Sequence, residues 1–287
     1  NHLFSNAKAL IFAGLFFSSK QSEIWLKKGL KIINDELSEQ VLDDGGHFEL
    51  SPMYHAIFLE DLLDLANIHQ AYEISLPSEL RIKIEPMFAW LESMCHPDSD
   101  IAFFNDATLG VSPSFGALLS YAKRLGYVIK EKVPQNLIHL EASGYIRVEN
   151  DDAVLISDVA NIGPDYLPGH GHADALSFEL SLFNQRIIIN SGISTYEIGL
   201  DRSTQRGTQS HSTITVDNQN SSEVWSGFRV ANRAKVFNIQ KFRYSNSVEF
   251  SACHDGYKKL KGNIVHCRKW SLGINSVTIV DNIWGSG

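Results

Sequence analysis

The chain has 287 residues, with 25 basic and 33 acidic side chains and a formal net charge of −8. Hydrophobic residues make up 44% and charged residues 20%, the composition of a globular protein, which excludes intrinsic disorder, collagen-like repeats and a disulfide scaffold. The longest apolar run near the start, 9–17, is interrupted by Gly14 and is far shorter than the roughly 20 residues that cross a bilayer. No membrane span is therefore predicted.

The net acidity is confined to the first half of the chain. Residues 1–150 carry 12 basic and 20 acidic side chains, whereas residues 151–287 carry 13 of each. Within the second half, residues 201–243 hold seven basic against three acidic side chains. This basic strip would attract a polyanion or, alternatively, form an ordinary solvated face.

The cysteines and the first residue bear on where the protein works. Cys95, Cys253 and Cys267 are too few and too scattered to predict a disulfide framework or a thiolate metal cluster, and they leave the redox compartment open. The chain opens on Asn1 rather than Met, so we interpret it as an internal or processed fragment, which leaves open whether a signal peptide has been removed.

Apolar residues recur every three or four positions through much of the first half, the spacing of helices with one buried face. Ser51 places a capping hydroxyl before Pro52, so one helix is expected to begin there. Five or so helices separated by short turns indicate an all-helical layer. The predicted helices lie at 7–17, 24–33, 54–65, 78–94 and 114–124.

After about residue 144 apolar and polar residues alternate, which is typical of strands. Asn184 and Gln185 between two such segments predict a hairpin turn. The pattern indicates an antiparallel β-sandwich that follows the helices, with the boundary between residues 130 and 145. The predicted strands lie at 175–182, 186–189, 211–217, 234–239, 247–252 and 277–280.

The segment 169–174, Gly-His-Gly-His-Ala-Asp, is the strongest candidate for chemistry. On an extended backbone residues two apart share a face, so His170, His172 and Asp174 would converge. Two imidazoles and a carboxylate suit a divalent transition metal, although a hydrogen-bonded structural pair remains the alternative. The glycines of the segment would leave room for a ligand.

The other candidate site residues are each less well supported when taken singly. Asn190 and His211 lie at the ends of neighbouring predicted strands and could complete a metal shell, although a lone histidine at a strand end is more often structural. Tyr54 would either pack in the core or act as a general acid or base near an imidazole. The sequence has no G-x-S-x-G, no Walker loop and no G-x-G-x-x-G after a strand, which argues against serine hydrolysis and nucleotide chemistry.

Five segments, in this order, resemble the heparinase II/III-like polysaccharide lyases, a group that includes heparinases and oligoalginate lyases. They are residues 1–10, 44–55, 170–174, 205–213 and 222–230. The resemblance implies an α+β multidomain protein, with an incomplete α/α toroid at 1–140 followed by an antiparallel β-sandwich at 141–287. It also implies that the N-terminal part of the toroid and the C-terminal part of the sandwich lie outside this chain.

The resemblance implies a carbon–oxygen lyase that cleaves a uronate-containing acidic polysaccharide by β-elimination. Hydrogen-bond donors must absorb the charge that develops on the uronate as the C5 proton leaves. By resemblance, Asn1 neutralises the carboxylate, His2 neutralises it or acts as base, and His170 is the active-site histidine. Tyr54 would abstract the proton or protonate the leaving oxygen. Whether the elimination is syn or anti decides which group is the base, and the sequence leaves this open.

The resemblance also assigns a Zn²⁺ ion to His172, His211 and the position of Asn190. Members of the group usually carry Asp where this chain has Asn190, so weaker metal binding is expected. Near this site, Arg206 could hold a uronate carboxylate or make a structural ion pair, and Trp225 could stack on a sugar or pack in the core.

The leading hypothesis is therefore a polysaccharide lyase whose partner is an acidic polysaccharide or oligosaccharide, with no nucleic acid, acting in the periplasm or outside the cell. One alternative is a noncatalytic glycan-binding relative in exopolysaccharide metabolism, which would not need all four catalytic candidates. A second is a cupin-like metal enzyme in which Glu179 joins the histidines, but the helical first half argues against it.

Overall fold

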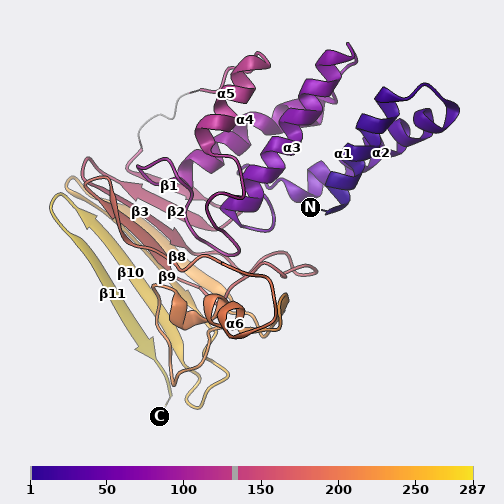
Figure 1. Cartoon of the computed structure of the whole chain (residues 1–287). Helices are drawn as coiled ribbons and strands as arrows, with labels where there is room; N and C mark the ends of the chain where they lie inside the picture. Colours follow the sequence, from indigo (N-terminus) through magenta and orange to yellow (C-terminus); the bar gives the residue numbers. More distant parts are fainter. Residues whose placement is uncertain (1, 131–134, 287) are drawn as a thin grey trace.

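The computed structural model describes residues 2–130 and 135–286, and in this part helices come first and strands follow (Figure 1). The five predicted helices are confirmed. They are α1 (His2–Phe16), α2 (Lys20–Gln40), α3 (Pro52–Ala71), α4 (Ser78–Ser93) and α5 (Phe115–Arg124). We call residues 2–124 the helical part and residues 137–284 the β part.

Serine side chains cap the first turns of α2, α3 and α5, at Ser19, Ser51 and Ser114. The Ser51 hydroxyl accepts a hydrogen bond from the Tyr54 backbone N–H, and Pro52 takes the first helical position, where its missing N–H costs nothing. In the same way Ser114 caps α5 through the Ala117 N–H. The Ser51 cap sets the position of Tyr54 on the first turn of α3.

The β part contains antiparallel sheets (Figure 1). A five-stranded sheet follows chain order: β1 (Leu137–Leu140), β2 (Tyr145–Glu149), β3 (Ala153–Asp158), β4 (Phe178–Leu182) and β5 (Gln185–Ile188). A four-stranded sheet has the order β11 (Val277–Trp284), β10 (Val265–Gly273), β9 (Ser247–His254) and β8 (Val236–Arg243). Between them in sequence lie α6 (Leu200–Arg206), a 3₁₀ turn at Thr208–Ser210, and the small pair β6 (Glu223–Trp225) and β7 (Arg229–Ala231).

The five-stranded sheet is covered on both faces. One set of its side chains, including Leu155 and Phe178, shares a core with Phe250 and Trp270 of the four-stranded sheet. Another set, including Tyr145 and Ile156, packs against the helical part through Trp90, Met94 and Phe104. The first sheet therefore lies between the second sheet and the helices, and the loops at this junction carry the candidate site.

The strand predicted at 211–217 is wrong. Only an isolated bridge, Val216 to Gln219, occurs there, because side-chain hydroxyls take the place of a ladder. The Ser212 hydroxyl bonds both the N–H and the carbonyl of Phe178, and the Thr213 hydroxyl donates to the Ala175 carbonyl. The strand predicted at 175–182 begins only at Phe178, after a turn in which Leu176 has a φ of 62°.

A disulfide joins Cys253 of β9 to Cys267 of β10, residues that are direct cross-strand partners. Cys95 is buried as a free thiol. The sequence had not revealed this pairing, because the two cysteines come together only through the strand register. Among the described residues, no helix is both long and apolar enough to cross a membrane.

Candidate active site

Tyr54 and His170 meet at the junction of the two parts. Their rings lie 4.3 Å apart between centroids, although one comes from α3 and the other from the loop before β4. The Tyr54 hydroxyl lies 2.7 Å from the Tyr196 hydroxyl, and either group can donate. Burial raises the pKa of the Tyr54 phenol, which favours its protonated form at neutral pH. The pair predicted from separate motifs is thus brought together, with Tyr196 added to it.

Asp106 is a buried carboxylate that the sequence did not single out. Its two oxygens lie 2.8 Å from His170 Nδ1 and 2.8 Å from His172 Nε2, and the Arg202 guanidinium bonds both of them. Burial alone would raise the pKa of Asp106, but the hydrogen bonds from the two histidines and Arg202 hold it well below its usual range. The carboxylate is therefore ionised, and it orients both rings.

The backbone around Asp106 explains how a loop holds it in place. Asn105 has a φ of 56°, a left-handed conformation that asparagine tolerates better than most residues. Its amide donates to the carbonyl of Leu50 and to the Tyr145 hydroxyl, while its Oδ1 accepts from the His172 N–H. Asn105 thus connects the loop of the helical part to the β part beside the site.

His170 is set up to use its outer nitrogen. Because Nδ1 faces the ionised Asp106, the neutral form of the ring carries its proton on Nδ1 and its lone pair on Nε2. Its side chain is 19% exposed, and Nε2 has no hydrogen-bond partner among the described residues. The phenol of Tyr54 and this imidazole are therefore two groups side by side that can transfer protons.

An aromatic surface borders these two groups. Tyr196 stacks on Phe228, with 5.6 Å between centroids and 19° between planes, and the Arg202 guanidinium lies over both rings. Trp225 on β6 is 51% exposed, so its ring is available to stack on a sugar rather than packed in the core.

Arg206 neither faces the site nor makes an ion pair with any described residue, the two roles that the sequence suggested. Its side chain is buried, and its N–H groups donate to the backbone carbonyls of Gly171, Gly227 and Arg229. It therefore fixes the loop of His170 and the β6–β7 turn from inside. Nor does Gly171 make room for a ligand: a Cβ there would come within 2.4 Å of Ile162 Cγ2, so the protein's own packing requires this glycine.

A candidate metal pocket lies behind His170. His172, Asp174 and His211 each offer one ligand atom, and these atoms all lie within 4.8 Å of one another. Buried His172 Nδ1, Asp174 Oδ2 and His211 Nε2 have no hydrogen-bond partner among the described residues. Asn190, the other predicted ligand, has its Oδ1 3.1 Å from His211 Nδ1. A group of orphaned acceptors such as this suits a cation.

The extended backbone expected at 169–174 is absent, since no strand covers these residues. The convergence of side chains has another cause: His170 and His172 share Asp106, and the backbone N–H of Ala173 bonds the Arg206 carbonyl. Of the other predicted residues, His2 lies exposed at the start of α1. Asn1 lies outside the described residues.

Glu179 does not belong to the metal pocket. Its oxygens bond His96 Nε2 at 2.8 Å and the backbone N–H groups of Phe103 and Asn190 at 2.8 and 3.1 Å. The cupin-like alternative required this carboxylate beside the histidines, so the structure does not favour it. Glu179 instead joins the β part to the helical part.

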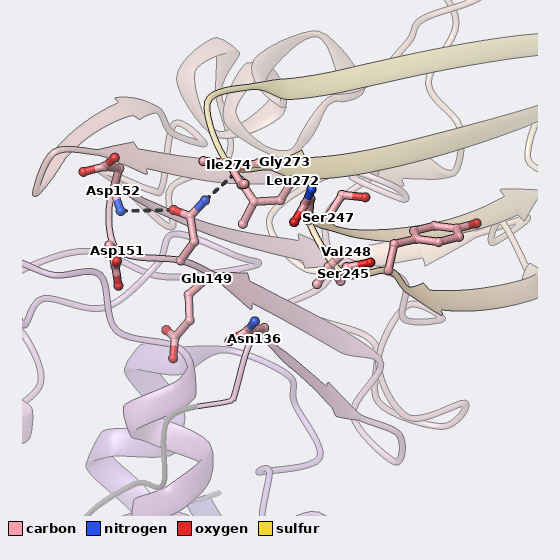
Figure 2. A pocket seen from close by; sticks show the side chains of 13 residues that line it. Asn136, Glu149, Asp151, Asp152, Ser245, Ser247, Val248, Leu272, Gly273 and Ile274 are labelled. Carbon is pink, nitrogen blue, oxygen red and sulfur yellow. Dashed lines mark hydrogen bonds between the residues drawn. The ribbon is translucent and has the colours of Figure 1, made fainter.

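A second hollow, of about 320 Å³, opens at the far hairpin ends of the sheets (Figure 2). Its lining includes the carboxylates of Glu149, Asp151 and Asp152, while Asn150 bonds the backbone of Asp152 and Gly273. None of the predicted site residues lines it. Three carboxylates would repel an acidic polymer, so this hollow is not a candidate for binding one.

The arrangement is an α+β fold with a tyrosine–histidine pair and a candidate metal pocket at its junction, and comparison with known proteins identifies its class. Residues 1–123 match the family model described as Heparinase II/III N-terminus, and residues 132–287 match Heparinase II/III-like, C-terminal. The chain belongs to the heparinase II/III-like family.

Curated relatives agree with this assignment. The chain is 28% identical over 242 residues to a heparin-sulfate lyase of Bacteroides stercoris and 28% identical over 244 residues to one of Pedobacter heparinus. Each match covers 77% of this chain and 36% of the relative. The chain thus spans about a third of the length of the curated relatives it matches.

Solved structures share the fold. A crystal structure of heparinase III superposes with a TM-score of 0.79 at 21% identity, covering 99% of this chain and 47% of that one. A heparan sulfate lyase from Pedobacter heparinus superposes with a TM-score of 0.71 at 21% identity, covering 98% and 45%.

Proposed function

We propose that the protein is a polysaccharide lyase that cleaves a uronate-containing acidic polysaccharide by β-elimination. The observation that carries the proposal is the contact of the Tyr54 phenol with the His170 ring, which Asp106 orients. A lyase needs one group to remove a proton and one to return it, and a phenol in contact with an imidazole can supply both. A glycan-binding protein has no use for such a pair.

In the proposed reaction the C5–H bond of the uronate breaks and the base takes the proton. The electron pair forms the C4–C5 double bond, the C4–O4 bond breaks, and the acid protonates the departing O4. No water or redox partner is consumed. His2 and Asn1 would neutralise the uronate carboxylate, which lowers the cost of charge that develops at C5.

Tyr54 and His170 can share this work in two ways. His170 Nε2 can accept the proton while Tyr54 protonates O4, or Tyr54 can do both in turn. Because burial raises the pKa of Tyr54, its resting state is the acid, which favours the first division. Trp225 would stack on a sugar ring at the edge of the site. We leave Arg206 out of the proposed contacts, because its donors already bond backbone carbonyls.

We also propose that the pocket of His172 and His211 holds Zn²⁺. The buried acceptors of this pocket that lack a hydrogen-bond partner among the described residues fit such an ion, which would supply a fixed positive charge beside the loop of His170. His172 would bind it through Nδ1 while Nε2 stays on Asp106, so that the same carboxylate orients a ligand and the catalytic histidine.

The organisation of the chain extends this proposal. We propose that α1–α5 form the later helices of an incomplete α/α toroid and that the two larger sheets form a β-sandwich domain. The core shared by the two sheets supports the sandwich. The sequence put the boundary at residue 140; since β1 pairs with β2, the boundary is better placed before Leu137.

The disulfide supports a location in the periplasm or outside the cell. Cys253 and Cys267 are paired across neighbouring strands, and such bonds persist in oxidising compartments. The test isolates the protein from its native compartment and alkylates it without reduction. Mass spectrometry should then show that Cys253 and Cys267 carry no alkyl group. Three alkylated cysteines would contradict this location.

The lyase proposal is tested by the absorbance of unsaturated uronates. The full-length protein is incubated with heparan sulfate, heparin, alginate and hyaluronan; heparan sulfate is the first choice because the relatives are named heparin-sulfate lyases. Tyr54→Phe should lower kcat by about 10²- to 10⁴-fold. Tyr72→Phe, at the opposite end of α3, serves as the matched control and should keep the wild-type rate. Absence of product from every polymer, or equal rates for Tyr54→Phe and wild type, would refute the proposal.

A further inference from the structure

We infer that the cation in this chain is held by His172, Asp174 and His211, and that Asn190 is a positioning residue for His211 rather than a ligand. The inference rests on the cation site of the proposed function. It replaces the ligand set of two histidines and residue 190 that the family resemblance implies.

The hydrogen bonds of the two histidines decide which nitrogens face the pocket. His172 Nε2 donates to Asp106 Oδ1 at 2.8 Å, so its Nδ1 carries the lone pair. His211 Nδ1 lies 3.1 Å from Asn190 Oδ1, an acceptor, so its Nε2 carries the lone pair. Both lone-pair nitrogens are buried and lack a partner among the described residues. This is the arrangement of metal-binding imidazoles whose second nitrogen is fixed by an acceptor.

Asp174 supplies the third atom and the charge. It is 1% exposed, and its Oδ2 is buried without a partner among the described residues. One ligand atom each from Asp174, His172 and His211 lies within 4.8 Å of the others, so small side-chain rotations would bring all three to the bond lengths of about 2.0–2.3 Å that zinc requires. Two imidazoles and one carboxylate make a site with a free fourth position.

Asn190 has no suitable atom left for the ion. Its Oδ1 accepts from His211 Nδ1, and its Nδ2, which is buried without a partner among the described residues, is a donor without a lone pair to give. Its backbone is fixed as well, since its N–H donates to Glu179 Oε1 at 3.1 Å. An aspartate here would have one oxygen for His211 and a second for the ion. With asparagine, Asp174 is left as the anionic ligand, and Asn190 keeps the task of orienting His211.

The test begins with the full-length protein from which metal has been removed with a chelator. Zinc is titrated into this protein without substrate, and calorimetry measures the Kd. Wild type should bind one zinc ion. Asp174→Asn should raise the Kd by about 100-fold or more, because it removes a charged ligand. The rise in Kd for Asn190→Ala should be at least 10-fold smaller than the rise for Asp174→Asn, because Asn190 bonds a ligand and not the ion. Asp61→Asn is the matched control, since Asp61 is a buried carboxylate of α3 that accepts hydrogen bonds from Ser5 and Lys8 of α1; it should stay near the wild-type Kd.

A second measurement reads the ligand set directly. In the cobalt-loaded protein, the visible absorption bands should shift in Asp174→Asn and keep their positions in Asn190→Ala. Far-ultraviolet circular dichroism of each metal-free variant identifies any that fail to fold. If Asp174→Asn does not fold, the cobalt spectrum of Asn190→Ala decides the question alone. The inference is overturned if wild type binds no zinc, or if Asn190→Ala shifts the bands while Asp174→Asn does not.

The outcomes separate this inference from the lyase proposal. A protein that cleaves uronate polymers but binds no zinc overturns the inference and leaves the activity standing. A protein that binds zinc through Asp174 but cleaves no polymer overturns only the proposed activity.

Discussion

The hydroxyl pair of Tyr54 and Tyr196 is the smallest unit of the site. Two phenols 2.7 Å apart cannot both be donors, so each limits the orientation of the other's proton. Burial raises the pKa of both groups. Tyr196 also stacks on Phe228 beside the His170 ring, so it links the catalytic phenol to the aromatic surface. We therefore expect Tyr196 to hold the Tyr54 hydroxyl in position.

Tyr196→Phe keeps the ring and removes only the hydroxyl. One hydrogen bond contributes about 1 kcal/mol, so kcat should fall roughly 5- to 10-fold while KM changes little. Initial rates on the uronate polymer that wild type cleaves measure both. Tyr166→Phe is the control, because the Tyr166 hydroxyl bonds Glu39 and not the site. A change confined to KM would show that Tyr196 binds sugar instead.

At this scale the sequence was informative only where residues sit in motifs. Tyr54 and His170 belong to segments that resemble a family, and the structure brings their rings together. The sequence did not identify Asp106, Tyr196 or Arg202 as site residues, because each acts through a partner that is far away in the sequence. Asp106 lies 64 positions from His170 and 96 from Arg202, and no local spacing links them.

At the scale of elements, periodicity predicted every helix of the helical part but not every strand of the β part. Each helix of the helical part exposes a face, and all five were predicted. β2 and β3 were missed, because the second sheet covers one face of these strands and the helical part covers the other. In β3 every residue is buried, so its sequence shows no alternation of apolar and polar residues that would indicate a strand.

The loop that carries Asp106 joins elements from both parts. The loop lies between α4 and α5, whereas the Arg202 partner of Asp106 lies on α6 in the β part. Arg202 is fully buried, so the loss of the carboxylate's charge would leave a guanidinium without its counter-ion in the interior. We expect this contact to be necessary for the stability of the junction.

Asp106→Asn should lower the free energy of unfolding by about 3–5 kcal/mol, the cost of breaking a buried ion pair by removing one partner. Urea denaturation followed by tryptophan fluorescence measures the change. Asp98→Asn breaks the more exposed pair with Arg186 and should cost less than about 1 kcal/mol. Equal losses in the two variants would show that the Asp106 pair is no more than a surface contact.

Across the whole molecule, polar groups hold the two parts together. The Arg147 guanidinium of β2 donates to the carbonyls of Ser93 and Cys95, and His96 bonds Glu179 and Ser181 of β4. The basic strip also changes meaning at this scale. Arg202 and Arg206, two of its seven basic residues, are buried and structural, so the strip is smaller than the sequence count suggests.

Two buried histidines, one in each part, couple the stability of the molecule to pH. His55 stacks on Trp90 in the helical part, and His254 lies 3.1 Å from His266 in the β part. Burial lowers the pKa of each to about 3, against about 6.5 in an unfolded chain. Between these values the unfolded state binds protons that the folded state does not, so stability is present above pH 6.5 and declines as the pH falls.

Each of these histidines should contribute a slope of up to about 1.4 kcal/mol per pH unit to the free energy of unfolding between pH 5 and 6.5. Urea denaturation at several pH values in this window measures the slope. His254→Gln should reduce the slope by close to one proton, because glutamine does not titrate. If His254→Gln and wild type lose stability in parallel, His254 is already protonated in the folded protein, and the β part tolerates a charge that its burial should exclude.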